Sequence, residues 1–184
     1  MNKLLFNILK LMGWRIHEQQ PDGVRKAIVC VAPHTSNWDF VIGKIAFGYY
    51  GIPTKFLIKK ELFFFPLGIL LRRLGGIPVD RKKKTNLTDQ AVEYFSHYDD
   101  IFLVFTPEGT REYNPEWKKG FYHIAERAGV PIYLGFIDYK NKTGGFDGKF
   151  EPTGDVDGDI LEIKRRLVKY SGRTLTNGIR PEEV

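Results

Sequence analysis

A histidine and an aspartate stand close together in the segment His34-Thr35-Ser36-Asn37-Trp38-Asp39. The apolar run 27–32 predicts a buried strand that ends at Pro33, and residues 38–50 predict a following helix. His34 is therefore expected at the carboxyl end of a strand, where sheets of this kind bind ligands. A carboxylate on one imidazole nitrogen fixes the tautomer and leaves the other nitrogen free as a base. The pair predicts removal of a proton from an acceptor hydroxyl.

Two structural interpretations of this pair stay open at the level of sequence. Asp39 follows Ser36, the expected helix N-cap, by three residues and can complete a capping box. His34 can also be a histidine satisfied within the fold. The sequence lacks a Gly-x-Ser-x-Gly elbow, and its single cysteine, Cys30, lies within the apolar run and is expected to be a buried hydrophobe. We expect no metal site, because the other histidines show no ligand spacing.

A second polar segment, Thr106-Pro107-Glu108-Gly109-Thr110-Arg111, directly follows the strongly apolar run 101–105. Gly109 allows close approach of the backbone to a ligand, and Arg111 offers a planar fork for a phosphate or carboxylate. Glu108 can accept a hydrogen bond from a ligand hydroxyl. The alternative is a structural ion pair between Glu108 and Arg111 within a turn.

A third segment runs from Gly75 to Lys84 and contains Arg81, which can hold a phosphate after a short strand. Its three lysines are either a solvated face or a patch facing anionic lipid. The preceding stretch 59–73 is dense in apolar residues and flanked by basic pairs. Such a stretch is buried on all sides, lies at a membrane or lines a groove for an acyl chain, and the basic flanks favour the membrane.

The composition agrees with one folded domain that has an anionic partner. The chain has 184 residues, is 42% hydrophobic and carries a net charge of +6. This length suits a single core, and the charge favours a nucleic acid, an anionic membrane or a phosphorylated substrate. Aromatic residues do not alternate with basic ones as in a base-stacking surface, so we expect no nucleic-acid partner. No apolar segment has the length of a membrane-spanning helix.

Strand-like and helix-like stretches alternate along the chain, which predicts an α/β fold with a mostly parallel central sheet flanked by helices. Residues 1–20 form an amphipathic helical element that either packs on the core or docks on a membrane, and residues 21–184 form the main domain. The glycines at 144–148 predict a turn, and residues 174–184 are expected to be loosely ordered. The remaining strands are expected at 55–58, 77–79 and 130–137, and the remaining helices at 85–98, 117–128 and 160–170.

In this order, the motifs resemble those of the lysophosphatidic acid acyltransferase and glycerol-phosphate acyltransferase family. His34-x4-Asp39 matches the family's catalytic motif, and Pro107-Glu108-Gly109-Thr110-Arg111 closely matches its acceptor-binding block. Residues 59–68 and 76–81 look like the second block, and 119–132 are similar to the fourth. The resemblance covers roughly residues 27 to 137, and the combination of the first two motifs is highly specific. It implies a glycerol-phosphate acyltransferase-like fold.

The resemblance also implies roles for individual residues. His34 would be the general base and Asp39 its orienting carboxylate, while the acceptor's glycerol-phosphate end would be bound by Lys59, Arg81, Glu108, Gly109, Thr110 and Arg111. The donor would be an acyl-CoA or acyl carrier protein thioester, with no metal or resident cofactor.

The acceptor implied by the resemblance is a lysophospholipid such as lysophosphatidic acid, and the location is peripheral on the cytoplasmic face of an anionic membrane. The fourth block lacks a second proline that the family often has, which leaves open another acceptor, such as a lyso-ornithine lipid. A non-catalytic lipid-binding module is the remaining alternative.

Overall fold

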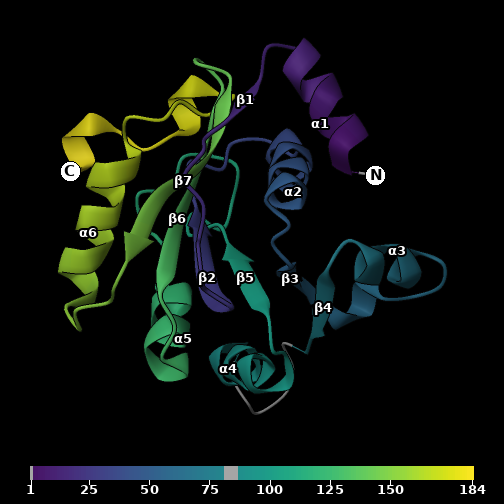
Figure 1. Ribbon diagram of the computed structural model, residues 1–184. Helices are drawn as coiled ribbons and strands as arrows, with labels where there is room; N and C mark the ends of the chain where they lie inside the picture. The colour runs from purple at the N-terminus through teal and green to yellow at the C-terminus, as the bar shows by residue number, and fades with distance from the viewer. Residues whose placement is uncertain (1, 81–86) are drawn as a thin grey trace.

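The computed structural model describes residues 2–80 and 87–184, and within them seven strands form one sheet in the order β1-β7-β6-β2-β5-β3-β4 (Figure 1). The neighbours β6-β2-β5-β3-β4 are all parallel, whereas β7 runs antiparallel to β6 and β1 is parallel to β7. The strands are β1 Arg15–Ile16, β2 Lys26–Val31, β3 Thr54–Lys59, β4 Gly76–Val79, β5 Ile101–Phe105, β6 Ile132–Asp138 and β7 Thr143–Phe150.

Helices cover both faces of this sheet, as Figure 1 shows. One face packs against α2 through a cluster that includes Val29 and Phe47, and the other packs against α4, α5 and α6 through a larger cluster that includes Ile28 and Ile163. The helices are α1 Asn2–Leu11, α2 Trp38–Tyr50, α3 Leu67–Arg73, α4 Leu87–His97, α5 Gly120–Ala128 and α6 Val156–Leu167, with short 3₁₀ turns η1 Lys60–Leu62, η2 Leu175–Asn177 and η3 Pro181–Glu183. The predicted α/β class with a mostly parallel sheet is confirmed.

The central strands are the most deeply buried part of the molecule. Ile28, Val29 and Cys30 of β2 are fully buried, because both faces of this strand are covered by helices. Buried parallel strands read as continuous apolar runs rather than as alternating ones. This is why the strand at 27–32 and the strand at 101–105 were recognisable in the sequence within one residue.

The helix α2 has the bounds that the sequence predicted. It ends at Gly51, whose backbone has the left-handed φ of 72° that glycine adopts without strain. Its N-terminus follows the His34 loop directly, so any side chain in its first turn is held beside that loop. The fold therefore fixes Asp39 next to His34 through the start of one helix.

The prediction of a turn at 144–148 is wrong. These glycines lie within β7, which pairs with β6 from Ile132↔Phe150 to Asp138↔Thr143 with a register shift between Leu134 and Gly135. Glycine disfavours strands intrinsically, but a partner strand that supplies hydrogen bonds along the whole segment overrides that preference. At Gly145 the missing side chain lets neighbouring residues approach the strand closely, since a Cβ there would lie 2.6 Å from the Cβ of His17.

The two ends of the chain are helical or turn-like and lie against the domain. α1 packs on α2 and covers only Asn2–Leu11 of the helical element expected at residues 1–20, because the chain continues into β1 at Arg15–Ile16. Docking of this helix on a membrane stays a prediction. The expectation of a loosely ordered C-terminal segment is wrong, because residues 171–184 form two 3₁₀ turns and make specific hydrogen bonds with the core.

Candidate active site

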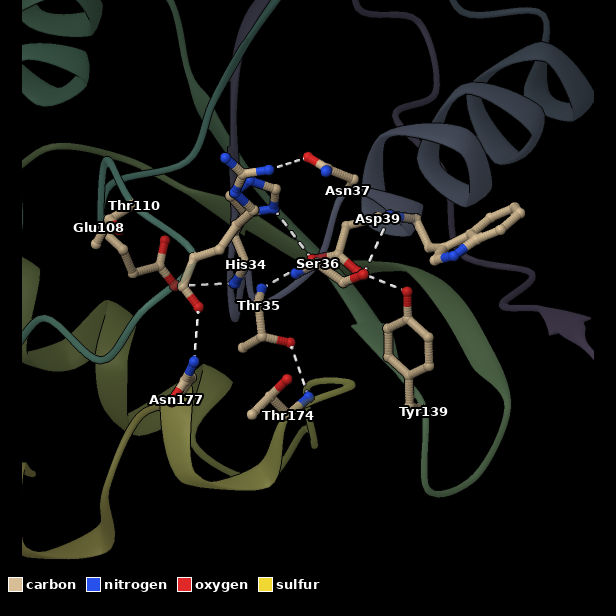
Figure 2. Close-up of polar contacts among 12 residues, drawn as sticks. His34, Thr35, Ser36, Asn37, Asp39, Glu108, Thr110, Tyr139, Thr174 and Asn177 are labelled. Carbon is tan, nitrogen blue, oxygen red and sulfur yellow. Dashed lines mark hydrogen bonds and ion pairs between the residues drawn. The ribbon is translucent and has the colours of Figure 1, made fainter.

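His34 and Asp39 form a hydrogen-bonded pair at the carboxyl end of β2. Nδ1 of His34 lies 3.0 Å from Oδ2 of Asp39, and Asp39 is only 5% exposed (Figure 2). An ionised carboxylate is a pure acceptor, so Nδ1 carries the proton and donates it. Nε2 of His34 is then the unprotonated nitrogen, which is the form that a general base requires.

Asp39 is held by four hydrogen bonds. Its Oδ2 also accepts the backbone N–H groups of Thr35 at 2.8 Å and Ser36 at 2.9 Å, while Oδ1 accepts the hydroxyl of Tyr139 at 2.6 Å. Burial alone would raise the pKa of Asp39, but the bonds from His34, Tyr139 and the two backbone groups outweigh it and lower the pKa below its usual value. Asp39 is therefore ionised at neutral pH.

The capping box of Ser36 and Asp39 that the sequence left open is only half formed, because the backbone N–H of Asp39 donates to the Ser36 backbone oxygen and not to its hydroxyl. Asp39 accepts the backbone N–H of Ser36, as in a capping box, and it also accepts the proton of His34. Asn37 occupies the N-cap position of α2, whereas the Ser36 hydroxyl accepts the backbone N–H of Trp38 at 3.2 Å. One carboxylate thus fixes the shape of the loop and the orientation of the imidazole.

Sequence reasoning missed Tyr139. This residue directly follows β6, and β6 lies beside β2 in the sheet, so their carboxyl ends meet at one edge. The hydroxyl of Tyr139 reaches Asp39 across 100 positions of sequence. Its only signal in the sequence is its place after a predicted buried strand, and that signal becomes useful once the order of the strands is known.

The second polar segment lies on the other side of His34, after β5. Glu108 is 4% exposed, and its Oε1 accepts the backbone N–H of His34 at 3.1 Å. Its Oε2 is buried and has no hydrogen-bond partner within the described residues. Burial raises the pKa of Glu108 to about 7, so near neutral pH this carboxyl is partly protonated. Glu108 therefore helps to fix the His34 loop by accepting the backbone N–H of His34.

Glu108 makes stability depend on pH, with a sign that follows from its raised pKa. A carboxyl that binds its proton more tightly in the folded state stabilises the fold at low pH and loses that contribution as pH rises through about 7. We compare the free energy of unfolding of Glu108→Gln with that of wild type at two pH values. Between pH 5 and pH 8, this difference is expected to shift in favour of the variant by on the order of 3 kcal/mol.

Urea unfolding of both proteins at the two pH values measures this difference. Glu116→Gln, an exposed carboxyl in the same loop, is the matched control and is expected to show little pH-dependent change. If the free energies of unfolding of wild type and Glu108→Gln differ by the same amount at both pH values, the raised pKa of Glu108 is contradicted.

The remaining residues of the block form a turn close to His34. Gly109 has a φ of +68° and lies so close to the Lys118 side chain that a Cβ there would be 2.6 Å from its Nζ. The Thr110 hydroxyl accepts the backbone N–H of Glu112 at 3.3 Å. Arg111 donates to the side-chain oxygen of Asn37, and in the part of the chain that the structure describes it forms no ion pair with Glu108.

Of the predicted site residues that the structure describes, Lys59 is not brought into this cluster. Lys59 is the last residue of β3, is exposed, and is not among the residues that line the cavity beside His34. Arg81 lies outside the described residues. The structure therefore brings together His34, Asp39, Glu108, Gly109, Thr110 and Arg111 at the carboxyl ends of β2 and β5.

A cavity of about 300 Å³ opens beside the His34–Asp39 pair and runs between α2 and the sheet. Glycines of α2, β6 and β7 are among the residues that line this cavity. Apart from His34 and Asp39, its wall is largely apolar and includes Phe40, Phe47, Phe56, Val104, Phe136 and Phe146. Such a cavity suits an extended hydrocarbon chain.

The His34–Asp39 pair lies beside a largely apolar cavity, and comparison with known proteins identifies the family of the chain. A model of the acyltransferase family matches residues 14–133. The crystal structure of the 1-acyl-sn-glycerophosphate (LPA) acyltransferase PlsC from Thermotoga maritima is similar, with a TM-score of 0.62 and 18% identity, covering 89% of this chain and 75% of that chain. No curated protein sequence matches the chain.

The protein belongs to the acyltransferase family, because the family model spans well over half of its length. The likeness to PlsC shows that the two proteins share a fold. The family that the two motifs indicated is therefore confirmed.

Proposed function

We propose that this protein moves a fatty acyl group from an acyl-CoA or acyl carrier protein thioester to the free hydroxyl of a lysophospholipid, such as lysophosphatidic acid. The observation that carries the proposal is the His34–Asp39 pair at the mouth of an apolar cavity. The pair supplies a base for a hydroxyl, and the cavity holds the chain of an acyl donor. No metal or resident cofactor is invoked.

In the proposed mechanism, Nε2 of His34 takes the proton of the acceptor hydroxyl while its oxygen attacks the thioester carbonyl carbon. The tetrahedral intermediate then collapses, the carbon–sulfur bond breaks, and the thiolate takes the proton from the imidazolium. Asp39 stabilises that imidazolium because it is ionised and bonded to Nδ1. Holding both substrates together lowers the entropic part of the barrier.

Direct attack without an acyl-enzyme agrees with the position of Cys30. This cysteine is fully buried in the cluster on the α4, α5 and α6 side of the sheet, whereas the cavity lies on the α2 side. Burial raises the pKa of its thiol well above the usual value, so it is a poor nucleophile.

The oxyanion of the intermediate needs donors that are not already used. Thr35 and Ser36 donate their backbone N–H groups to Asp39, and Trp38 donates its own to the Ser36 hydroxyl. These three amides therefore hydrogen-bond within the loop and are not free for the substrate.

The acceptor phosphate is proposed to be bound by Arg111 and, by resemblance, by Lys59 and Arg81.

The length of the donor chain is proposed to be limited by the cavity. Gly43 of α2 lines it, and a Cβ built there would meet Phe47 at 3.8 Å and Ile137 at 4.0 Å, which are ordinary contacts. A larger side chain at this position therefore fills the cavity without a backbone clash. Each buried methylene contributes about 0.8 kcal/mol, so displacing two of them changes relative kcat/KM about tenfold.

Gly43→Leu is expected to shift the ratio of kcat/KM for palmitoyl and decanoyl thioesters at least tenfold toward decanoyl, and Gly43→Ala is expected to cause a smaller shift. Turnover of both donors by each variant provides the measurement. The decanoyl rate is the internal control, because it should stay near the wild-type value. An unchanged ratio in Gly43→Leu would place the acyl chain elsewhere.

Docking at a membrane is proposed from the apolar side chains that α1, the loop before α3 and α3 expose. Phe65 is 83% exposed and Leu11 is 88% exposed, and neither is covered by another part of the described chain. Further exposed apolar residues of the same elements are Leu4, Leu5, Ile8, Met12, Phe64, Ile69 and Leu70. α3 ends in Arg72 and Arg73, which suit an anionic lipid surface.

No helix in residues 2–80 or 87–184 is long and apolar enough to span a bilayer. The proposed location is peripheral, on the cytoplasmic face, where a soluble thioester carrier can reach the same surface as the acceptor.

Phe65→Ser is expected to weaken binding to vesicles that contain anionic phospholipid by about tenfold or more, because burying a phenylalanine contributes about 1.5–3 kcal/mol. Sedimentation with vesicles measures the bound fraction. Leu87→Ser is the control, since Leu87 is an exposed apolar residue at the start of α4, on the opposite face of the sheet. Equal binding by Phe65→Ser and wild type would remove this region from the membrane contact.

A further inference from the structure

The C-terminal segment Ser171–Gly178 lies against both loops of the active site, although it is outside the residues matched by the family model. The backbone N–H of Thr174 donates to the Thr35 hydroxyl at 3.2 Å, and the Asn177 side chain donates to the backbone oxygen of Arg111 at 2.9 Å. Figure 2 shows Thr174 and Asn177 on this segment, facing the His34 loop and the loop after β5. The segment thus joins the two motifs.

The path of this segment is closely defined next to the catalytic loop. Gly172 is buried, and a Cβ there would lie 2.5 Å from Cγ2 and 2.6 Å from Oγ1 of Thr35. The backbone of Ser171 accepts the N–H of Tyr139 at 2.8 Å. With the neighbours on both sides fixed, the position of Arg173 is fixed as well.

The guanidinium group of Arg173 lies beside Trp38, with its Cζ 5.9 Å from the centre of the Trp38 ring. Burial raises the pKa of Tyr139, whose hydroxyl contacts Asp39, and the positive charge of Arg173 opposes that rise. Within the described residues, Arg173 forms no ion pair with a carboxylate. An exposed arginine that contacts an aromatic ring and has no acidic partner keeps its N–H donors available for an anion.

Arg111 approaches the same loop from another part of the chain. It donates to the side-chain oxygen of Asn37, whereas Arg173 lies beside Trp38, so each of the two arginines contacts the segment between His34 and Asp39. Two arginines of this kind provide donors for the oxygens of a phosphate ester. Neither is neutralised by an acid in the part of the chain that the structure describes.

We propose that Arg173 is a second anion-binding residue of the active site, besides Arg111, and that it binds the phosphate ester of a substrate. The inference rests on the proposed function only for the identity of that substrate. A phosphate ester occurs both in a lysophospholipid acceptor and in the phosphopantetheine arm of a thioester donor, and the two sources are separated by experiment.

A purely structural role for Arg173 leads to different results. If its contact with Trp38 only stabilised the loop, removing it would lower the unfolding temperature and kcat together, and phosphate affinity would be unaffected once the protein was folded. A binding role instead raises Kd and KM for phosphate-bearing ligands and leaves kcat near the wild-type value.

Calorimetry with glycerol 3-phosphate tests binding directly and does not require turnover. Arg173→Gln is expected to weaken binding about tenfold, Arg173→Lys is expected to restore part of it, and Arg165→Gln on α6 is expected to match wild type. Arg165 is a suitable control because it is exposed and lies on α6 beside Glu162, at 3.8 Å. Equal affinities of Arg173→Gln and wild type, or no binding by wild type, would overturn the inference.

Steady-state kinetics then identifies which substrate carries the phosphate. A higher KM for lysophosphatidic acid, with unchanged rates for monoacylglycerol, assigns Arg173 to the acceptor, whereas a higher KM for acyl-CoA assigns it to the donor. Loss of kcat with both KM values unchanged would contradict a binding role. If glycerol 3-phosphate binds but no acyl group is transferred by wild type, the proposed function fails and the anion site stands.

Discussion

Replacing His34 by alanine is expected to lower the rate of acyl transfer by about a thousandfold while leaving the fold and substrate binding nearly unchanged. General-base catalysis contributes about 10²–10⁴ to enzymatic rates, and His34 is the group whose free Nε2 faces the cavity in the proposed mechanism. The loss should appear in kcat, because alanine removes the base without removing the cavity or Arg111.

The matched control for this variant is His123→Ala. His123 also pairs with a carboxylate, Glu126 at 3.4 Å, but it lies on the exposed face of α5. This control is expected to retain wild-type turnover. A His34→Ala protein that keeps a normal unfolding temperature and near-normal turnover would refute His34 as the base.

Replacing Asp39 by asparagine is expected to cause the second large loss, about a hundredfold to ten-thousandfold in kcat. Losing the orienting carboxylate of a Ser-His-Asp triad costs about 10⁴, and here asparagine removes the negative charge that stabilises the imidazolium formed when His34 takes the proton. Asparagine can still accept the backbone N–H groups of Thr35 and Ser36, so the loop is expected to keep its shape. The loss then reports on the imidazole.

Asp159→Asn provides a control for the removal of a buried carboxylate. Asp159 is as buried as Asp39 and also accepts a tyrosine hydroxyl, from Tyr122 at 2.6 Å, and a backbone N–H, from Thr153 at 2.7 Å. If both variants lose stability but only Asp39→Asn loses kcat, the role of Asp39 is catalytic orientation. A comparable loss of kcat in both would attribute the effect to destabilisation.

Those parts of the site that depend on local sequence were predictable. His34 and Asp39 meet because the strand before His34 and the helix that contains Asp39 have clear apolar patterns, and only six residues separate the two elements. Glu108 and Arg111 follow the apolar strand β5, which lies beside β2 in a parallel sheet. The carboxyl ends of adjacent parallel strands meet at one edge, so two motifs far apart in sequence come together.

The contributions that were missed depend on contacts between distant segments. Tyr139 reaches Asp39 only because β6 lies on the other side of β2, and the glycines of β7 form a strand because β6 supplies their hydrogen bonds. The C-terminal segment carries little apolar pattern of its own. Its order comes from hydrogen bonds to Thr35, Tyr139 and Arg111, which no local propensity encodes.

The central claim is transfer of an acyl group from a thioester to a lysophospholipid by direct attack. Mass spectrometry of the lipids formed when the purified protein meets palmitoyl-CoA and lysophosphatidic acid in detergent tests it most directly, with His34→Ala alongside. We expect wild type alone to form the diacylated acceptor and an equal amount of free thiol. No acylated product from lysophosphatidic acid or a lyso-ornithine lipid, with either coenzyme A or acyl carrier protein as donor, would contradict it and indicate a lipid-binding module.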